Sequence, residues 1–139
     1  MDYIKPFSEW LDGILQIELP LTAKAICFNL YENENFFQIQ LIASSYFEEN
    51  DSEWPCHEVY TTGEDLFEIE RSEDMDDWII GLELSANLVY QYLASGMKRN
   101  KLQSFEAVAI GFVDGDLITL YSNNDIKEAA IKDYLATIK

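Results

Sequence analysis

The sequence predicts a single α+β domain over residues 1–139, in which two β-hairpins form an antiparallel sheet with helices packed on one face. Three observations support this fold class: two pairs of apolar, strand-like segments flank turn sequences, a long apolar stripe at helical spacing separates the pairs, and an amphipathic segment lies near each end. With 139 residues, 48% apolar and 14% aromatic, the chain is suited to one hydrophobic core.

The first predicted elements are a short helix and a hairpin. Residues 24–32 and 36–47 alternate apolar and polar positions, and residues 33–35 between them have a turn composition, so this region predicts paired strands. Before it, five apolar residues recur at the three and four spacing of one helical face: Phe7, Trp10, Leu11, Ile14 and Leu15.

The middle of the chain predicts a short strand and then the longest helix. The strand covers residues 66–70 and follows loop-forming residues. The helix is predicted by apolar residues spaced three or four positions apart: Met75, Ile79, Leu82, Ala86, Val89, Leu93 and Met97. We expect this apolar stripe to face the core.

The last third predicts a second hairpin and a terminal helix. Residues 107–113 and 116–121 flank Asp114-Gly115, a dipeptide that favours the positive φ angles of a tight hairpin turn. Asp125 and Glu128 have the spacing of a helix cap and its third residue, and the apolar positions after them predict a terminal helix. Such a helix is also a common dimer element, so homodimerisation stays open.

The charge of the chain restricts its partners. Nine basic and 26 acidic residues give a net charge of -17, which repels nucleic acid and anionic membrane surfaces and attracts basic proteins. The longest uncharged run, residues 84–97, is shorter than a membrane span requires. Cys27 and Cys56 form no disulfide framework and no export leader is evident, so we expect a cytoplasmic protein.

Half of the acidic residues, 13 of 26, lie in residues 48–77 with a single basic residue, Arg71. Aromatic residues are interleaved with them, and Trp and Tyr are common anchors of protein interfaces. One interpretation is a solvated loop that only keeps the protein soluble. The other is a partner-binding surface, in which Trp54 is either an anchor or a plug of the local core, and whose candidate residues are Asp51, Glu53, Trp54, Glu58, Tyr60, Glu64, Asp65, Asp76, Asp77 and Trp78.

Catalytic and metal chemistry find little support in the sequence. Asp51-Ser52-Glu53 lacks the glycine and the closing glutamate of a calcium loop. His57 is the only histidine, so with two cysteines the chain has too few ligands for a zinc site of its own. His57 is also the only imidazole that could act as the base of a nucleophile. We therefore expect no metal, no cofactor and no enzymatic activity, and the roles of Cys56 and His57 stay open.

In its length, strong acidity and mixed α/β pattern, the chain resembles bacterial toxin-immunity proteins. The resemblance implies a basic protein toxin as partner, and a nuclease is the favoured class because a nuclease cleft must be cationic to hold phosphate. The alternative is a non-enzymatic adaptor or homodimeric interaction domain whose acidity serves only solubility. Salt separates the two hypotheses, because electrostatic recognition weakens as ionic strength rises.

Overall fold

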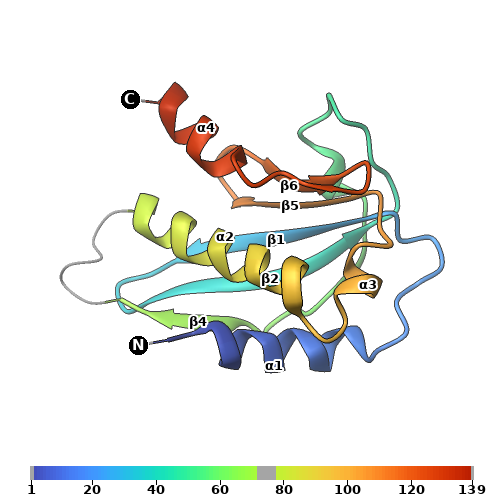
Figure 1. Cartoon of the computed structure of the whole chain (residues 1–139), viewed down its shortest axis with the longest axis horizontal. Helices are drawn as coiled ribbons and strands as arrows, with labels where there is room; N and C mark the ends of the chain where they lie inside the picture. The colour runs from blue at the N-terminus through green and yellow to red at the C-terminus, as the bar shows by residue number, and fades with distance from the viewer. Residues whose placement is uncertain (1, 72–77, 139) are drawn as a thin grey trace.

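Figure 1 shows the computed structural model, which describes residues 2–71 and 78–138 and contains four α-helices and one seven-stranded sheet in that part of the chain. The bounds of the elements are α1 Ile4–Leu15, β1 Ala25–Glu32, β2 Phe36–Ser44, the 3₁₀ helix η1 Trp54–Cys56, β3 Glu58–Thr61, β4 Phe67–Glu70, α2 Trp78–Ser95, α3 Arg99–Leu102, β5 Ala107–Phe112, β6 Ile118–Ser122, β7 Asp125–Ile126 and α4 Ala130–Thr137. The predicted elements occur in the predicted order, the structure adds η1, β3, α3 and β7, and the α+β fold class is confirmed.

The sheet has the strand order β3-β2-β1-β5-β6-β7, with β4 beside the first half of β2 and β3 beside its second half. Both predicted hairpins are present, since β1 pairs with β2 and β5 pairs with β6 in antiparallel fashion. The central pair differs from the expected antiparallel sheet, because β1 and β5 run parallel, with Phe28 opposite Ile110. Two parallel neighbours need a long connection between them, because the chain must return to the end of the sheet where β1 begins. The segment from β2 to α3 provides this connection.

The parallel pair determines what lies together at one end of the sheet. Parallel strands end at the same edge, so the residues that follow β1 and those that follow β5 are neighbours there. Figure 1 shows that α2 also begins at this end, next to the connection between β5 and β6. This arrangement positions the candidate site described below.

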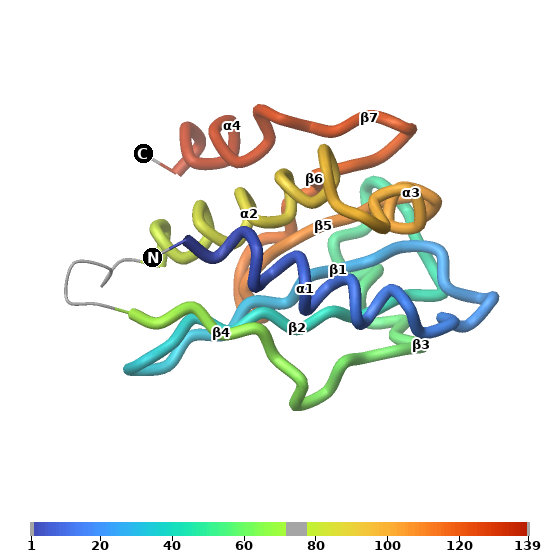
Figure 2. The backbone as a smooth tube through the Cα atoms, turned by 60° about the horizontal axis from the view of Figure 1, so that its bottom comes forward, coloured from blue at the N-terminus to red at the C-terminus, as the bar shows by residue number. Residues whose placement is uncertain are grey.

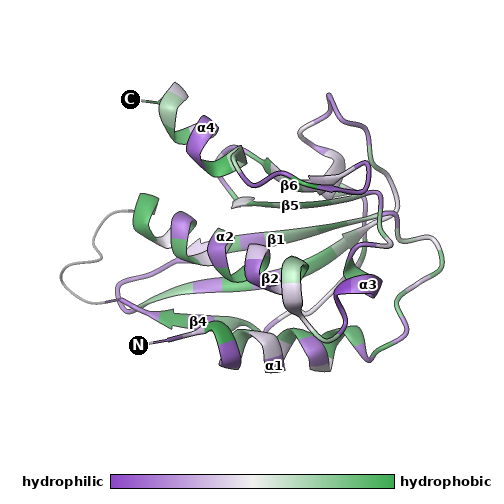
Figure 3. Ribbon diagram, in the orientation of Figure 1, coloured by the Kyte–Doolittle hydropathy of each residue, from purple (hydrophilic) through white to green (hydrophobic). Residues whose placement is uncertain are grey.

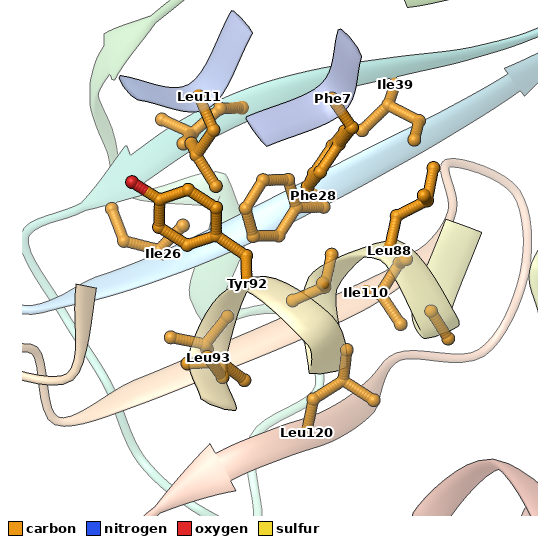
Figure 4. Close-up of a cluster of buried hydrophobic side chains, with 14 of the residues drawn as sticks. Phe7, Leu11, Ile26, Phe28, Ile39, Leu88, Tyr92, Leu93, Ile110 and Leu120 are labelled. Atoms are coloured by element: carbon orange, nitrogen blue, oxygen red, sulfur yellow. The ribbon is translucent and has the colours of Figure 1, made fainter. Parts of the chain in front are cut away.

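The main core lies between the sheet and helices α1 and α2, which run side by side across one face (Figure 2). Alternate residues of each strand point to this face, as the period of two requires. Figure 4 shows Phe7 and Leu11 of α1 meeting Phe28 of β1 and Tyr92 of α2, all of which are at most 1% exposed. The Tyr92 hydroxyl donates a hydrogen bond to the carboxylate of Asp12, which joins the two helices.

The opposite face of the sheet carries a small second core at one end. Ala25 and Cys27 of β1 and Ala107 and Ala109 of β5 present small side chains there, and the indole of Trp54 packs over them. The segment between β2 and β3 therefore covers part of this face, while the helices cover the other.

Helix α2 confirms the predicted apolar stripe between Leu82 and Leu93, where the stripe residues are buried. Figure 3 shows hydrophilic and hydrophobic residues mixed along α1 and α2, as amphipathic helices require. Met97 departs from the prediction, since it lies beyond the helix and is 80% exposed. Gly81 allows the close approach of α2 to β2, because a Cβ at this position would lie 2.5 Å from the Phe37 ring.

One predicted turn and one predicted helix cap are wrong. Neither Asp114 nor Gly115 has a positive φ, and five residues rather than two connect β5 to β6. The tight turn lies instead between β6 and β7, where Asn123 and Asn124 have φ of 53° and 61°. The predicted cap at Asp125 is also absent, because Asp125 pairs in β7 with β6 and α4 begins at Ala130 without a side-chain cap.

Among the residues that the structure describes, no helix combines the length and the apolar character needed to cross a bilayer.

Candidate partner-binding site

Trp54 is the one predicted anchor whose burial contradicts its placement among the partner-binding residues. Its side chain is only 2% exposed and contacts the ring of Phe47 edge-on, with 5.5 Å between ring centroids. The Ser44 hydroxyl donates a hydrogen bond of 2.7 Å to the carbonyl oxygen of Trp54. Trp54 is therefore the plug of the second core, and it cannot touch a partner while that core is intact.

Three of the predicted carboxylates occupy two separate places. Asp51 is half-buried and accepts a hydrogen bond of 2.9 Å from the backbone N–H of Glu53, which fixes the turn before η1. Glu53 is exposed. Asp65 lies in the loop between β3 and β4, where its carboxylate accepts a hydrogen bond of 3.2 Å from the indole N–H of Trp10.

Glu58, Tyr60 and Glu64 belong to the outer edge of the sheet. Glu58 and Glu64 are exposed, whereas Tyr60 is half-buried and packs against the main core. In the strand order, β3 is separated from β5 by β2 and β1, so three inter-strand spacings amount to about 14 Å. The predicted residues therefore do not converge on one site.

Trp78 lies at the other end of the molecule from Trp54, as the first residue of α2. Its side chain is 38% exposed, and its ring meets that of Phe112 edge-on at 6.2 Å between centroids. The predicted residues Asp76 and Asp77 lie outside the described residues. Trp78 is thus the predicted aromatic that is open to solvent next to a hollow in the surface.

The hollow beside Trp78, here called the aromatic cavity, has a volume of about 580 Å³. Its lining residues come from the end of the parallel pair, the start of α2, the connection from β5 to β6, and α4. Its lining combines aromatic rings, an apolar floor and carboxylates: Leu30, Tyr31, Glu32, Trp78, Leu82, Phe112, Val113, Asp114, Gly115, Asp116, Ile118 and Tyr134. A volume in this range is typical of pockets that bind a small molecule.

Among the described residues that line the aromatic cavity, three are carboxylates and none is a lysine or an arginine. Glu32 is paired with Arg71, whose Nη1 lies 3.2 Å from Oε2 of Glu32. Within the described part of the chain, Asp114 and Asp116 form no ion pair. The uncompensated negative charge of the cavity is therefore that of Asp114 and Asp116.

Tyr134 of α4 holds Asp116 in place. Its hydroxyl donates a hydrogen bond of 3.0 Å to Oδ2 of Asp116. Burial, followed by this hydrogen bond and the carboxylate charge, raises the pKa of Tyr134, so the phenol remains a donor at neutral pH. The other oxygen of Asp116 is left to accept from a ligand.

A second hollow, the sheet-face groove, lies on the other side of the 113–117 connection between β5 and β6. Its volume is about 790 Å³, and it shares Asp114, Asp116 and Tyr134 with the aromatic cavity. The exposed Glu53 lines its far side, near η1. The 113–117 connection is therefore an acidic ridge between two hollows, and it links two of the predicted residues, Glu53 and Trp78.

Gly111 allows the 113–117 connection to fold closely over β5. A Cβ at this position would collide with the backbone carbonyl oxygen of Asp116. Because that contact is with backbone, a larger residue would displace the connection and the two aspartates with it.

Four residues of the site are not among those predicted from the sequence: Asp114, Asp116, Glu32 and Tyr134. The predicted hairpin turn accounted for Asp114 without a function. The available signal was the pair of carboxylates in Asp114-Gly115-Asp116 directly after a strand that is apolar throughout. Its meaning depends on the parallel pairing of β1 and β5, which brings Glu32 and Trp78 to the same end.

The cysteine and histidine side chains show no metal-binding arrangement in the described residues, where no group of three or more potential ligands gathers. Burial raises the pKa of the Cys27 thiol to about 12, which makes it a weak nucleophile at neutral pH. Cys56 and His57 are exposed, and the His57 ring lies 4.9 Å from that of Tyr46.

A scan against protein-family models, a search of curated proteins and a search of solved structures found no match to this chain.

Proposed function

We propose that this chain is a cytoplasmic immunity-type protein that binds a basic protein toxin and neutralises it, with a nuclease as the favoured class of toxin. The observation that carries the proposal is the acidic ridge at residues 113–117. Asp114 and Asp116 lie between two hollows, and the described residues that line these hollows include further carboxylates and aromatic rings but no lysine or arginine.

Electrostatic attraction favours the association of this chain with a cationic protein. A net charge of -17 attracts a cationic protein over distances of about a Debye length, and such steering raises association rates by about 10-fold to 1000-fold. A nuclease cleft presents cationic groups to phosphate, so the exposed carboxylates of the ridge can occupy the positions of phosphates. Occlusion of the cleft then prevents access of nucleic acid.

The aromatic cavity supplies the second component, which is short-range contact. Charge alone gives fast but weak and salt-sensitive association, whereas desolvated aromatic contacts slow dissociation. Trp78 is solvent-accessible beside Asp114, so both components are present within one surface. The predicted carboxylates Glu58, Glu64 and Asp65 belong to the opposite edge and contribute mainly to the overall field.

The homodimer alternative receives less support from the terminal helix. Ile131 and Leu135 of α4 are each only 8% exposed and pack in the main core of the same chain. The apolar face of α4 is therefore largely covered without a second copy.

The experiment begins with capture of partners from extracts of the source cells on the tagged chain at low salt, followed by elution with a salt gradient. The captured protein is then purified and its nuclease activity is titrated with the chain. We expect a basic protein that is inhibited stoichiometrically and whose affinity falls as salt rises. A partner that binds equally at low and high salt, or whose activity is unchanged by saturating chain, contradicts the proposal.

The role of the ridge is tested with the double variant Asp114→Asn/Asp116→Asn. Its expected association rate at low salt is about tenfold lower than that of the wild type, because rim charges act mainly on association. Glu106→Gln is the matched control, since Glu106 is exposed and directly precedes β5, whereas Asp114 follows its other end. Equal rates for the double variant and the control would refute the placement of the interface at the ridge.

A further inference from the structure

The aromatic cavity contains the parts of a binding site for a single cationic side chain. It combines a solvent-accessible indole, three other aromatic residues and two carboxylates that form no ion pair within the described part of the chain. Cations are attracted to the faces of aromatic rings, and tryptophan is the best partner for them. The combination distinguishes the cavity from a merely acidic surface, because the exposed carboxylates share a hollow with aromatic rings.

The protein itself contains an example of this recognition next to the cavity. The guanidinium carbon of Arg71 lies 4.5 Å from the centroid of the Phe37 ring. Its Nη1 donates hydrogen bonds of 3.2 Å to the Glu32 carboxylate and 2.8 Å to the Asn33 carbonyl oxygen. One guanidinium is thus held by a ring face, a carboxylate and a backbone carbonyl.

Arg71 and the cavity lie at the two ends of one row of aromatic rings. Phe37 contacts Phe112 at 6.5 Å between centroids, and Phe112 contacts Trp78 at 6.2 Å. Arg71 covers the Phe37 end of the row. At the other end, Trp78 is 38% exposed and faces a hollow that Asp114 and Asp116 also line.

We propose that the aromatic cavity is a receptor for one arginine side chain of the basic partner, which stacks on Trp78 and pairs with Asp114 and Asp116. This assignment rests on the proposed function, because the basic partner supplies the arginine. Arginine fits better than lysine, since the planar guanidinium stacks on aromatic rings and donates hydrogen bonds in a fork that matches carboxylates. Glu32 contributes less, because Arg71 already neutralises it.

Tyr134 acts as a positioning residue for this receptor. Its hydrogen bond to Oδ2 orients the Asp116 carboxylate and leaves the second oxygen for the guanidinium. Removal of the hydroxyl in Tyr134→Phe is expected to weaken arginine binding by about threefold while cation selectivity is retained.

The test uses three small probes that differ only in the side chain: the N-acetyl, N-methylamide derivatives of arginine, lysine and citrulline. Citrulline has nearly the shape of arginine without its charge. Binding is followed by NMR through the indole N–H signal of Trp78, which the variant Trp78→Phe identifies. The signals of Trp10 and Trp54 are internal references, since neither residue lines the cavity.

The expected result is a saturable shift of the Trp78 signal with the arginine probe, a weaker effect with lysine and none with citrulline. In Asp114→Asn/Asp116→Asn, the affinity for the arginine probe should fall about tenfold, because charge-assisted hydrogen bonds are lost. Glu106→Gln should bind as the wild type does. The proposal is overturned if citrulline shifts Trp78 as strongly as arginine, if arginine causes no saturable shift, or if the double variant binds arginine normally.

This experiment separates the receptor from the proposed function. A salt-sensitive basic partner together with a cavity that ignores arginine would leave the immunity function standing and remove the receptor. Arginine binding at Trp78 without any basic protein partner would do the reverse.

Discussion

Replacement of Trp54 by alanine tests whether this residue belongs to the core or to the interface. The indole is 2% exposed, and loss of a buried tryptophan costs about 3–5 kcal/mol of folding free energy. We expect the upper part of this range, because Ala25, Ala107 and Ala109 beneath the indole lie on paired strands that cannot move in to fill the space. Such a loss is a large share of the about 5–15 kcal/mol that stabilises a typical domain.

The assay is urea unfolding followed by circular dichroism, which does not depend on the tryptophan signal. With an m-value of about 2 kcal/mol/M, the midpoint of Trp54→Ala should fall by about 2 M. Trp78→Ala is the matched control, since this half-exposed side chain should contribute at most about 1 kcal/mol to stability. A loss below about 1 kcal/mol for Trp54→Ala would refute the core role and restore Trp54 as a candidate anchor.

Other predictions concern packing and thiol chemistry. Gly81→Ala should destabilise the fold by about 1–3 kcal/mol in urea unfolding, because the added methyl meets the Phe37 ring. Gly13→Ala should instead stabilise α1 by about 0.5–1 kcal/mol, because a Cβ there meets no neighbouring atom within 4 Å. Equal effects of the two substitutions would contradict this packing. A thiol reagent should label the exposed Cys56 and spare the buried Cys27 in the native protein, and equal labelling rates would contradict the burial of Cys27. Because burial raises the pKa of Cys27 from 9.0 to about 12, the unfolded chain loses the thiol proton first, so stability should decline from pH 9 towards pH 12, and more steeply in the wild type than in Cys27→Ala.

Much of the fold follows from local patterns. The alternation of apolar residues in 24–32 and 36–47 predicts β1 and β2, and the stripe from Leu82 to Leu93 predicts the buried face of α2. These predictions succeed because the period of apolar residues matches the period of the element that buries them.

Predictions of turns and caps failed where tertiary pairing competes with local preference. Asp125 has the sequence signature of a cap, yet its backbone pairs with Ser122 across the Asn123-Asn124 turn. Asp114-Gly115 favours a tight turn, yet the connection is longer and folds over Gly111. Pairing between β6 and β7 determines the outcome for Asp125, whereas after β5 the Gly115 N–H donates a local turn hydrogen bond of 2.8 Å to the Phe112 carbonyl oxygen.

The candidate site could be predicted only in part. An acidic segment with aromatic residues is evident from the sequence, and Trp78 belongs to the site. The role of Asp114 and Asp116 depends on strand order, which no local pattern encodes. Trp54 could not be assigned from its neighbours in sequence, because the small residues that accept its indole come from β1 and β5.

The most direct test of the interface is hydrogen–deuterium exchange of the chain with and without its captured partner. We expect binding to slow exchange in the 113–117 connection and in the first turn of α2, with little change at β3 and the loop that carries Glu64 and Asp65. Protection confined to β3 and that loop would contradict it, and would place the partner on the opposite edge of the sheet.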